Sequence, residues 1–151
     1  MSTLHSRIVG GIKDAMRNKD KIRLATLRDA KSKFMLEQTK TGSTDELSDA
    51  EVIKILSKLQ RQRLETSEVY KSQGREDLAE DEIAQAKVLS EFLPKALTED
   101  EIKAKVEEII VQLGVSSMRD MGKVMGVASA EMEGRADGKV IAQFVRETLL
   151  S

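Results

Sequence analysis

The sequence contains no cysteine, no tryptophan and one histidine, and these absences remove several kinds of chemistry. Without cysteine there is no disulfide framework, no thiolate metal site and no cysteine nucleophile. With a single histidine a zinc site is close to excluded, so no metal is expected. Aromatic residues make up 3% of the chain. The core must therefore come from Leu, Ile, Val, Met and Ala, a composition that favours helix over strand.

Long apolar segments are also absent. The apolar runs are short, as in Ile109-Ile110-Val111, and no membrane span is predicted. No charged and then apolar leader precedes a cleavage site, so no signal peptide is predicted. The 151 residues are 40% hydrophobic with nine glycines and one proline, which indicates a folded chain rather than a disordered one. We therefore expect a cytoplasmic protein.

Charge is balanced overall and uneven locally. The 25 Lys and Arg residues nearly cancel the 26 Asp and Glu residues, so no global positive field indicates nucleic-acid binding. Residues 1–40 are basic, with ten cationic and four acidic side chains, and residues 41–100 are acidic, with eight and fourteen. On a helical wheel the cations of the second predicted helix scatter around the circumference. This scatter favours a solvated helix surface over an RNA-binding stripe.

Helix signals follow one another along the chain and predict an all-α fold of about seven helices with no strand. Ser, Thr or Asp residues cap most of the expected starts, and Gly or Pro marks most of the expected ends. The expected helices run from Ser2 or Thr3 to about Asn18, from Asp20 to the polar stretch around Gly42, from Ser48 with its Glu51 capping box to about Gly74, from Arg75 to Pro94, from Thr98 with its Glu101 capping box to Gly114, from Ser117 to about Glu133, and from Asp137 onward.

The best domain boundary lies between Pro94 and Thr98. It predicts an N-terminal multi-helix domain at residues 1–94 and a small C-terminal three-helix domain at residues 95–151. A unit of roughly 55 residues is near the size at which burial barely offsets chain entropy. We therefore expect the C-terminal domain to be docked or mobile.

Two local patterns carry more than one interpretation. Gly10 and Gly11 interrupt the first helix, so we expect a close helix contact or a bend there. Gly134 to Lys139 looks like a phosphate loop, but its glycine spacing is short, Val140 replaces the Ser or Thr that binds magnesium, and no strand precedes it. We interpret this segment as a helix end at Gly134, a cap at Asp137 and a tight approach at Gly138.

The helix predicted from Ser117 carries an apolar seam with Gly122 and Gly126 beside it. The seam consists of Met118, Met121, Met125, Ala128 and Met132. Methionine is common on adaptable binding surfaces, so a partner helix is one possible occupant. The stronger interpretation is that the seam packs the core of a three-helix unit and that its glycines let a neighbouring backbone come close.

Basic residues of the C-terminal segment lie away from its apolar positions. They are Arg119, Lys123, Arg135, Lys139 and Arg146. Such a set can contact phosphates and supply affinity without sequence readout. A solvated face predicts the same pattern, and acidic residues such as Glu131 and Glu147 dilute the positive charge.

No group of residues in the sequence is able to run a reaction. His5 has no second histidine, so we expect a surface or capping role for it. Carboxylates such as those of Glu80-Asp81-Glu82 are consecutive and diverge on a helix, which does not make a metal cage. Ser116 and Ser117 with Lys123 are too few for a nucleophilic site. We therefore expect neither catalytic residues nor a cofactor.

Four motifs in order resemble the GatB/YqeY family over essentially the whole chain. They are Gly74-Arg75-Glu76-Asp77-Leu78-Ala79, Phe92-Leu93-Pro94-Lys95-Ala96-Leu97-Thr98, Met121-Gly122-Lys123-Val124-Met125 and Gly134-Arg135-Ala136-Asp137-Gly138-Lys139-Val140. Stand-alone YqeY-like proteins are similar to the C-terminal tail of the GatB subunit of the tRNA-dependent amidotransferase. That enzyme converts mischarged Glu-tRNA(Gln) or Asp-tRNA(Asn) to the correct amide.

The resemblance implies a tRNA-binding role for the C-terminal segment, because the helical tail of the amidotransferase engages the tRNA while its chemistry lies elsewhere. The family label is carbon–nitrogen ligase with glutamine as amido donor, but the residues give it no catalytic support. Besides Lys123, Arg135 and Lys139, the matched signature comprises Gly122, Met125, Gly134, Ala136, Asp137 and Gly138.

Three hypotheses follow. The first is a non-catalytic tRNA-binding or accessory module, with tRNA and a protein of tRNA aminoacylation or amidation as partners. The second is a helical protein-interaction adaptor that uses the methionine seam. The third is a true amide-transfer enzyme, which the residues support least.

Overall fold

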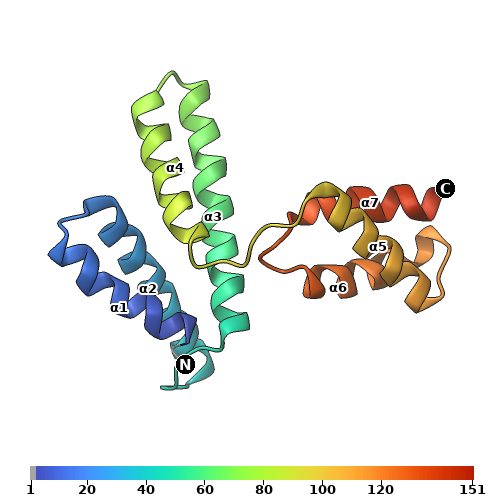
Figure 1. The fold of residues 1–151 in the computed structure, drawn as a ribbon, viewed down its shortest axis with the longest axis horizontal. Coiled ribbons are helices and arrows are strands. Elements are labelled where there is room, and N and C mark those ends of the chain that lie inside the picture. The colour runs from blue at the N-terminus through green and yellow to red at the C-terminus, as the bar shows by residue number, and fades with distance from the viewer. Residues whose placement is uncertain (1–2) are drawn as a thin grey trace. The chain divides into compact units, whose positions relative to one another are not determined.

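The structure is a computed structural model that describes residues 3–151. Within that range the chain forms seven α-helices, one short 3₁₀ helix and no strand, which confirms the all-α prediction (Figure 1). The helices are α1 (Leu4–Arg17), α2 (Lys21–Thr41), α3 (Asp49–Ser72), α4 (Glu76–Ser90), α5 (Glu99–Leu113), η1 (Met118–Asp120), α6 (Met121–Glu131) and α7 (Gly138–Leu150). None of the helices that the structure describes is both long enough and apolar enough to cross a membrane.

Capping side chains set most of the helix starts. The Thr3 side chain accepts a hydrogen bond from the backbone N–H of Ser6. The alternative cap, Ser2, lies outside the described residues. Asp20 and Asp137 cap α2 and α7 as predicted, and both capping-box bonds between Thr98 and Glu101 are present. Gly42 and Gly114 end α2 and α5 in the left-handed conformation. These boundaries were predictable because each depends on neighbouring residues alone.

Two helix boundaries differ from the prediction. The helix α4 ends at Ser90 rather than at Pro94, because the N–H groups of Glu91, Phe92 and Leu93 each bond to the carbonyl three residues earlier in tighter turns. The helix predicted from Ser117 to Glu133 begins as the 3₁₀ turn η1, because the N–H of Asp120 bonds to the Ser117 carbonyl oxygen, and α6 ends at Glu131.

The contacts of the chain group into two units, one ending at Leu93 and the other beginning at Pro94. We call them the N-terminal unit and the C-terminal unit. The grouping places Pro94 with the second unit, whereas the sequence prediction placed it at the end of the first. Each unit has its own core of buried apolar side chains. That the units are independent folding domains remains a prediction.

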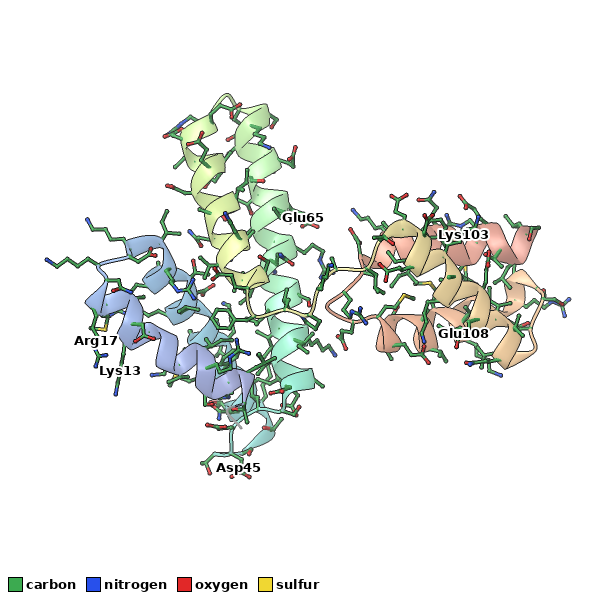
Figure 2. The ribbon with its side chains drawn as sticks, in the orientation of Figure 1. Lys13, Arg17, Asp45, Glu65, Lys103 and Glu108 are labelled. Carbon is green, nitrogen blue, oxygen red and sulfur yellow. The ribbon has the colours of Figure 1, made fainter. Side chains whose placement is uncertain are left out.

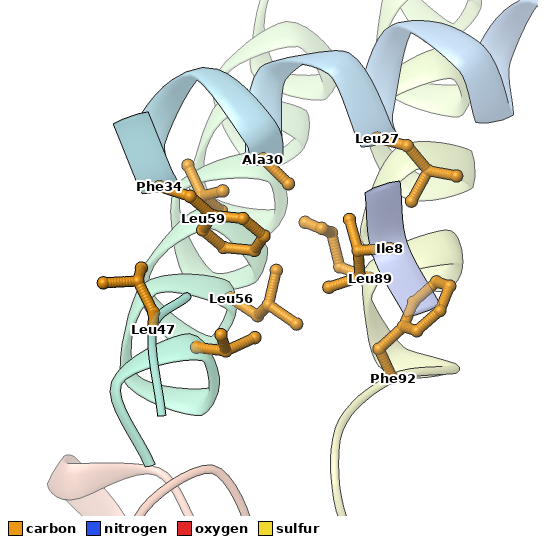
Figure 3. Close-up of a cluster of buried hydrophobic side chains, with 10 residues drawn as sticks. Ile8, Leu27, Ala30, Phe34, Leu47, Leu56, Leu59, Leu89 and Phe92 are labelled. Atoms are coloured by element: carbon orange, nitrogen blue, oxygen red, sulfur yellow. The ribbon is translucent and has the colours of Figure 1, made fainter. Parts of the chain in front are cut away.

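The core of the N-terminal unit lies among α1, α2, α3 and α4. Side chains from all four helices meet there, including Ile8, Phe34, Leu56 and Leu89 (Figure 3). Gly11 faces this packing, since a Cβ atom at Gly11 would lie 3.1 Å from Leu27 Cδ1. The expected close helix contact is therefore confirmed at Gly11. A Cβ atom at Gly10 would meet no heavy atom within 4 Å, so packing does not explain that glycine.

His5 is buried, with 9% of its surface exposed, so the expected surface or capping role is wrong. Its Nδ1 atom accepts the backbone N–H of Leu47 at 3.1 Å, and its ring centroid lies 4.9 Å from that of Phe34. The segment before α3 folds back onto α1 and brings this N–H to the ring. His5 is therefore a structural residue that anchors a loop.

The methionine seam lies mainly in the core of the C-terminal unit. Met132 is buried, and Met121 and Met125 pack against the buried cluster that α5, α6 and α7 share. The core interpretation of the seam is thus confirmed for these three residues, whereas Met118 is 38% exposed. The expected close backbone approach is wrong at Gly122, Gly126 and Gly138, because a Cβ atom at each would meet no heavy atom within 4 Å.

Candidate nucleic-acid interface

The loop between α6 and α7 is hydrogen-bonded to the segment that precedes α5. Leu97 donates its backbone N–H to the carbonyl oxygen of Arg135 at 2.8 Å. In return, Arg135 Nε donates to the carbonyl oxygen of Lys95 at 3.2 Å. These bonds join two of the motifs that carry the family resemblance, residues 92–98 and residues 134–140, at one end of the C-terminal unit (Figure 1).

The backbone conformation of the loop between α6 and α7 explains how Arg135 is positioned to make these two bonds. Gly134 has a φ of +78°, a conformation that glycine adopts at no steric cost. The N–H groups of Arg135 and Ala136 both bond to the Met132 carbonyl oxygen, at 2.9 and 3.2 Å. Asp137 then accepts the N–H of Lys139 at 2.9 Å and starts α7. The Arg135 carbonyl oxygen is the acceptor that this turn offers to Leu97.

The positive charges of Arg135 and Lys95 affect the Glu101 carboxylate in the capping box of α5. Hydrogen bonds from the backbone N–H and then the side chain of Thr98 hold the pKa of Glu101 below its ordinary value. The charges of Arg135 and Lys95 lower the pKa of Glu101 further. We call these cations and Lys139 the Arg135 corner. The Glu101 carboxylate offsets part of the positive charge of the Arg135 corner.

An exposed stripe continues from this corner along α7. Ile141, Val145 and Leu149 are the buried residues of α7. Lys139, Gln143 and Arg146 follow the opposite side at i, i+4 and i+7, and all three are exposed. The Gln143 side chain donates to Glu147 at 3.2 Å, which places one carboxylate at the margin of the stripe.

The structure separates the predicted cations into two groups. Arg135, Lys139 and Arg146 belong to the corner and the α7 stripe. Arg119 and Lys123 are exposed in η1 and the first turn of α6, at the end of α6 away from the Arg135 loop. The 11 residues of α6 put about 16 Å between its ends. Sequence reasoning missed Lys95, whose only signal was its place in the 92–98 motif.

No three side chains of His, Asp or Glu among residues 3–151 come together in a way that could hold a metal ion. The acidic run Glu80-Asp81-Glu82 lies on α4 and forms no such group.

The chain belongs to the family described as Yqey-like protein, whose model matches residues 5–149. It is 28% identical over 146 residues to the altered inheritance of mitochondria protein 41, mitochondrial, of Pyrenophora tritici-repentis, a match that covers 95% of this chain and 79% of that protein. It is also 35% identical over 57 residues to a subunit of the glutamyl-tRNA(Gln) amidotransferase of Thermococcus gammatolerans. That match covers 35% of this chain and spans only 9% of the amidotransferase subunit.

Proposed function

We propose that the C-terminal unit is a non-catalytic tRNA-binding module that acts with a protein of tRNA aminoacylation or amidation. The observation that carries the proposal is the fixed position of Arg135. Its backbone is tied to Leu97 and its Nε to Lys95, while its terminal guanidinium nitrogens make no hydrogen bond with any described residue. A guanidinium held in this way is already oriented for bidentate contact with a phosphate.

The neighbouring cations support a phosphate-binding role. Lys95 and Lys139 are exposed at the same corner, and Arg146 follows Lys139 two turns along α7. Phosphate contacts of this kind position a nucleic acid and supply affinity without reading its sequence. The relative in T. gammatolerans has glutamyl-tRNA(Gln) in its name, which supports tRNA as the nucleic acid. Arg119 and Lys123 extend the proposed contact to a second group of phosphates.

Several observations favour a binding module over an enzyme or an adaptor. The single histidine is buried and bonded to Leu47, and the sequence has no cysteine. Because Met121, Met125 and Met132 pack in the core, the seam does not support the adaptor alternative. The carbon–nitrogen ligase label stays an implication of the family alone.

Fluorescence anisotropy with labelled bulk tRNA tests the proposal over a series of salt concentrations. We expect binding at low salt that weakens steeply as salt rises. Arg135→Glu and Lys139→Glu should weaken binding to many tRNAs alike, and each lost phosphate contact should reduce the slope of log affinity against log salt by about one. Lys54→Glu, an exposed reversal on α3, is the matched control and should retain the wild-type slope.

Two results would overturn the proposal. The first is the absence of tRNA binding at low salt with micromolar protein. The second is amidation of a charged tRNA by this chain alone, which would establish a catalytic role. Equal loss of affinity in the Lys54→Glu control would show that net charge rather than the Arg135 corner is responsible.

The compartment is part of the same proposal. We propose the cytoplasm as the compartment of the protein, because the sequence predicts neither a membrane span nor a signal peptide. The relative in P. tritici-repentis is named as mitochondrial, so the two compartments have to be separated by experiment. Cell fractionation with antibodies against the native chain distinguishes them.

A further inference from the structure

A second surface lies on the N-terminal unit, on the side of α2 that faces away from the core. The buried residues of α2 are Thr26, Leu27, Ala30 and Phe34. Along the opposite side runs a shallow, open groove of about 640 Å³ between α2 and Ile12 of α1. We call it the α1–α2 groove, and neither the tRNA proposal nor the family match accounts for it.

The floor of the α1–α2 groove is apolar. Met35 is 56% exposed and Leu36 is 55% exposed, which places two large apolar side chains next to each other on a solvent-facing helix surface. Ile12 completes the floor from α1. One turn further along α1, Met16 is also 54% exposed, outside the lining of the groove. Adjoining exposed apolar side chains of this size are typical of surfaces that a partner covers.

The rim of the α1–α2 groove is positively charged and has no counter-charge of its own. Arg28 and Lys31 line it, and no Asp or Glu belongs to the lining. Neither of these two cations forms an ion pair with any residue in the described range. The carboxylate next to Arg28 along the chain, Asp29, is instead paired with Arg63 and Lys33.

Further cations lie on α1 outside the lining of the α1–α2 groove. Lys13 and Arg17 project from α1 into solvent (Figure 2). The groove follows α2 from Arg28 to Thr39, a length of about 16 Å at 1.5 Å per residue, which matches roughly three turns of helix. An apolar floor of this length with a cationic rim is complementary to a helix that has an apolar stripe and acidic flanks.

We propose that the α1–α2 groove binds an acidic amphipathic helix of a partner protein. The apolar stripe of that helix covers Ile12, Met35 and Leu36, and its carboxylates pair with Arg28 and Lys31. Met35 adapts its side-chain shape to the partner. An RNA ligand would use the cations but would leave the apolar floor uncovered, so the floor favours a protein helix.

The probe is a fluorescent synthetic peptide of about four helical turns, with Leu at i, i+3, i+4 and i+7 and Glu on the flanks. The first control peptide keeps the leucines and has Lys in place of Glu. The second keeps Glu and has Gln in place of Leu. We expect the full-length chain to bind the acidic amphipathic peptide at least about tenfold more tightly than either control. Amide chemical-shift changes should map to α1 and α2.

Paired variants test whether peptide binding depends on the α1–α2 groove or on the general charge and hydrophobicity of the surface. Leu36→Glu should weaken binding of the acidic peptide at least about tenfold. Leu64→Glu on α3, where Leu64 is 44% exposed, is the matched control and should bind as the wild type does. Lys31→Glu should weaken binding of the acidic peptide and make that binding less dependent on salt. Lys58→Glu on α3 should change neither the affinity nor its salt dependence. All four changes are on exposed or rim positions and should leave the fold intact.

Three outcomes would overturn the proposal. One is equal binding of the acidic peptide and the two control peptides. Another is a sedimentation equilibrium in which the chain self-associates and Leu36→Glu abolishes the association, because a second copy is then the occupant. The third is loss of tRNA binding in Lys31→Glu with no change in peptide binding, which would make the α1–α2 groove an RNA contact.

Discussion

Leu97 donates its backbone N–H to the carbonyl oxygen of Arg135 at 2.8 Å, and the residue after Leu97 is Thr98, the N-cap of α5. The start of α5 is therefore attached to the loop that precedes α7. The charge of Arg135 also reaches Glu101, the second member of the capping box. Two motifs that look like separate helix boundaries in the sequence thus form one structural corner, which holds three cations of the proposed interface, Lys95, Arg135 and Lys139.

The capping box makes the stability of the C-terminal unit depend on pH. The folded state holds the pKa of Glu101 below its ordinary value of 4.5, chiefly through the bonds from Thr98. A lowered carboxyl pKa stabilises the fold above the unfolded value, and this contribution disappears as pH falls through the folded pKa. Glu101→Gln should therefore destabilise α5 near pH 7, and its difference from the wild type should shrink below about pH 4.5.

Amide hydrogen exchange of α5 at pH 7, combined with thermal unfolding from pH 7 down to pH 3, measures this difference. Glu99→Gln is the matched control, because Glu99 lies in the same first turn but belongs to no capping box. A gap between wild type and Glu101→Gln that is constant over the whole pH range would show that the ionisation of Glu101 does not contribute to stability.

How much of the fold could be predicted depends on how local each feature is. The caps Thr3, Asp20, Thr98 and Asp137 were predictable because an N-cap bonds to an N–H two or three residues away. The end of α4 was not, since tight turns over residues 91–93 end the helix before Pro94 can. The proline marked the boundary between the units rather than the last helical residue.

The candidate site was likewise predictable only in its local features. The five cations of the C-terminal segment could be listed from their positions relative to the apolar residues, but the pattern could not show that Arg135 bonds to Lys95. That bond depends on how the loop before α7 packs against the segment before α5. The α1–α2 groove was missed because a helical wheel of α2 alone scatters its cations, whereas the groove gathers Arg28 and Lys31 beside Ile12 of another helix.

His5 should contribute to stability through its ring nitrogen. His5→Phe keeps a ring against Phe34 but removes the Nδ1 acceptor, which leaves the buried N–H of Leu47 without a partner. An unpaired buried donor costs about 1–3 kcal/mol. Urea unfolding should show a loss of this size, and Lys13→Ala on the exposed side of α1 should show almost none. Equal midpoints for wild type and His5→Phe would contradict the anchoring role.

The two adjacent glycines of α1 should respond differently to alanine. Gly10→Ala places a methyl group in open space and should stabilise the protein by about 0.5–1 kcal/mol through helix propensity. Gly11→Ala places the same methyl group 3.1 Å from Leu27 Cδ1, so the Leu27 side chain has to shift. We expect Gly11→Ala to be the less stable of the two. Parallel urea unfolding curves of both variants measure this, and the reverse order would contradict the close contact at Gly11.

The two units should unfold independently if each core supports its own helices. Leu56 is fully buried in the first core and Ile141 is 2% exposed in the second, so Leu56→Ala and Ile141→Ala should each cost their own unit about 2–5 kcal/mol. Amide hydrogen exchange on the full-length chain measures the effect helix by helix. Leu56→Ala should weaken protection in α1 to α4 only, and Ile141→Ala in α5 to α7 only. Loss of protection in both units from either change would show that the chain folds as a single cooperative domain, because its two cores would then be coupled.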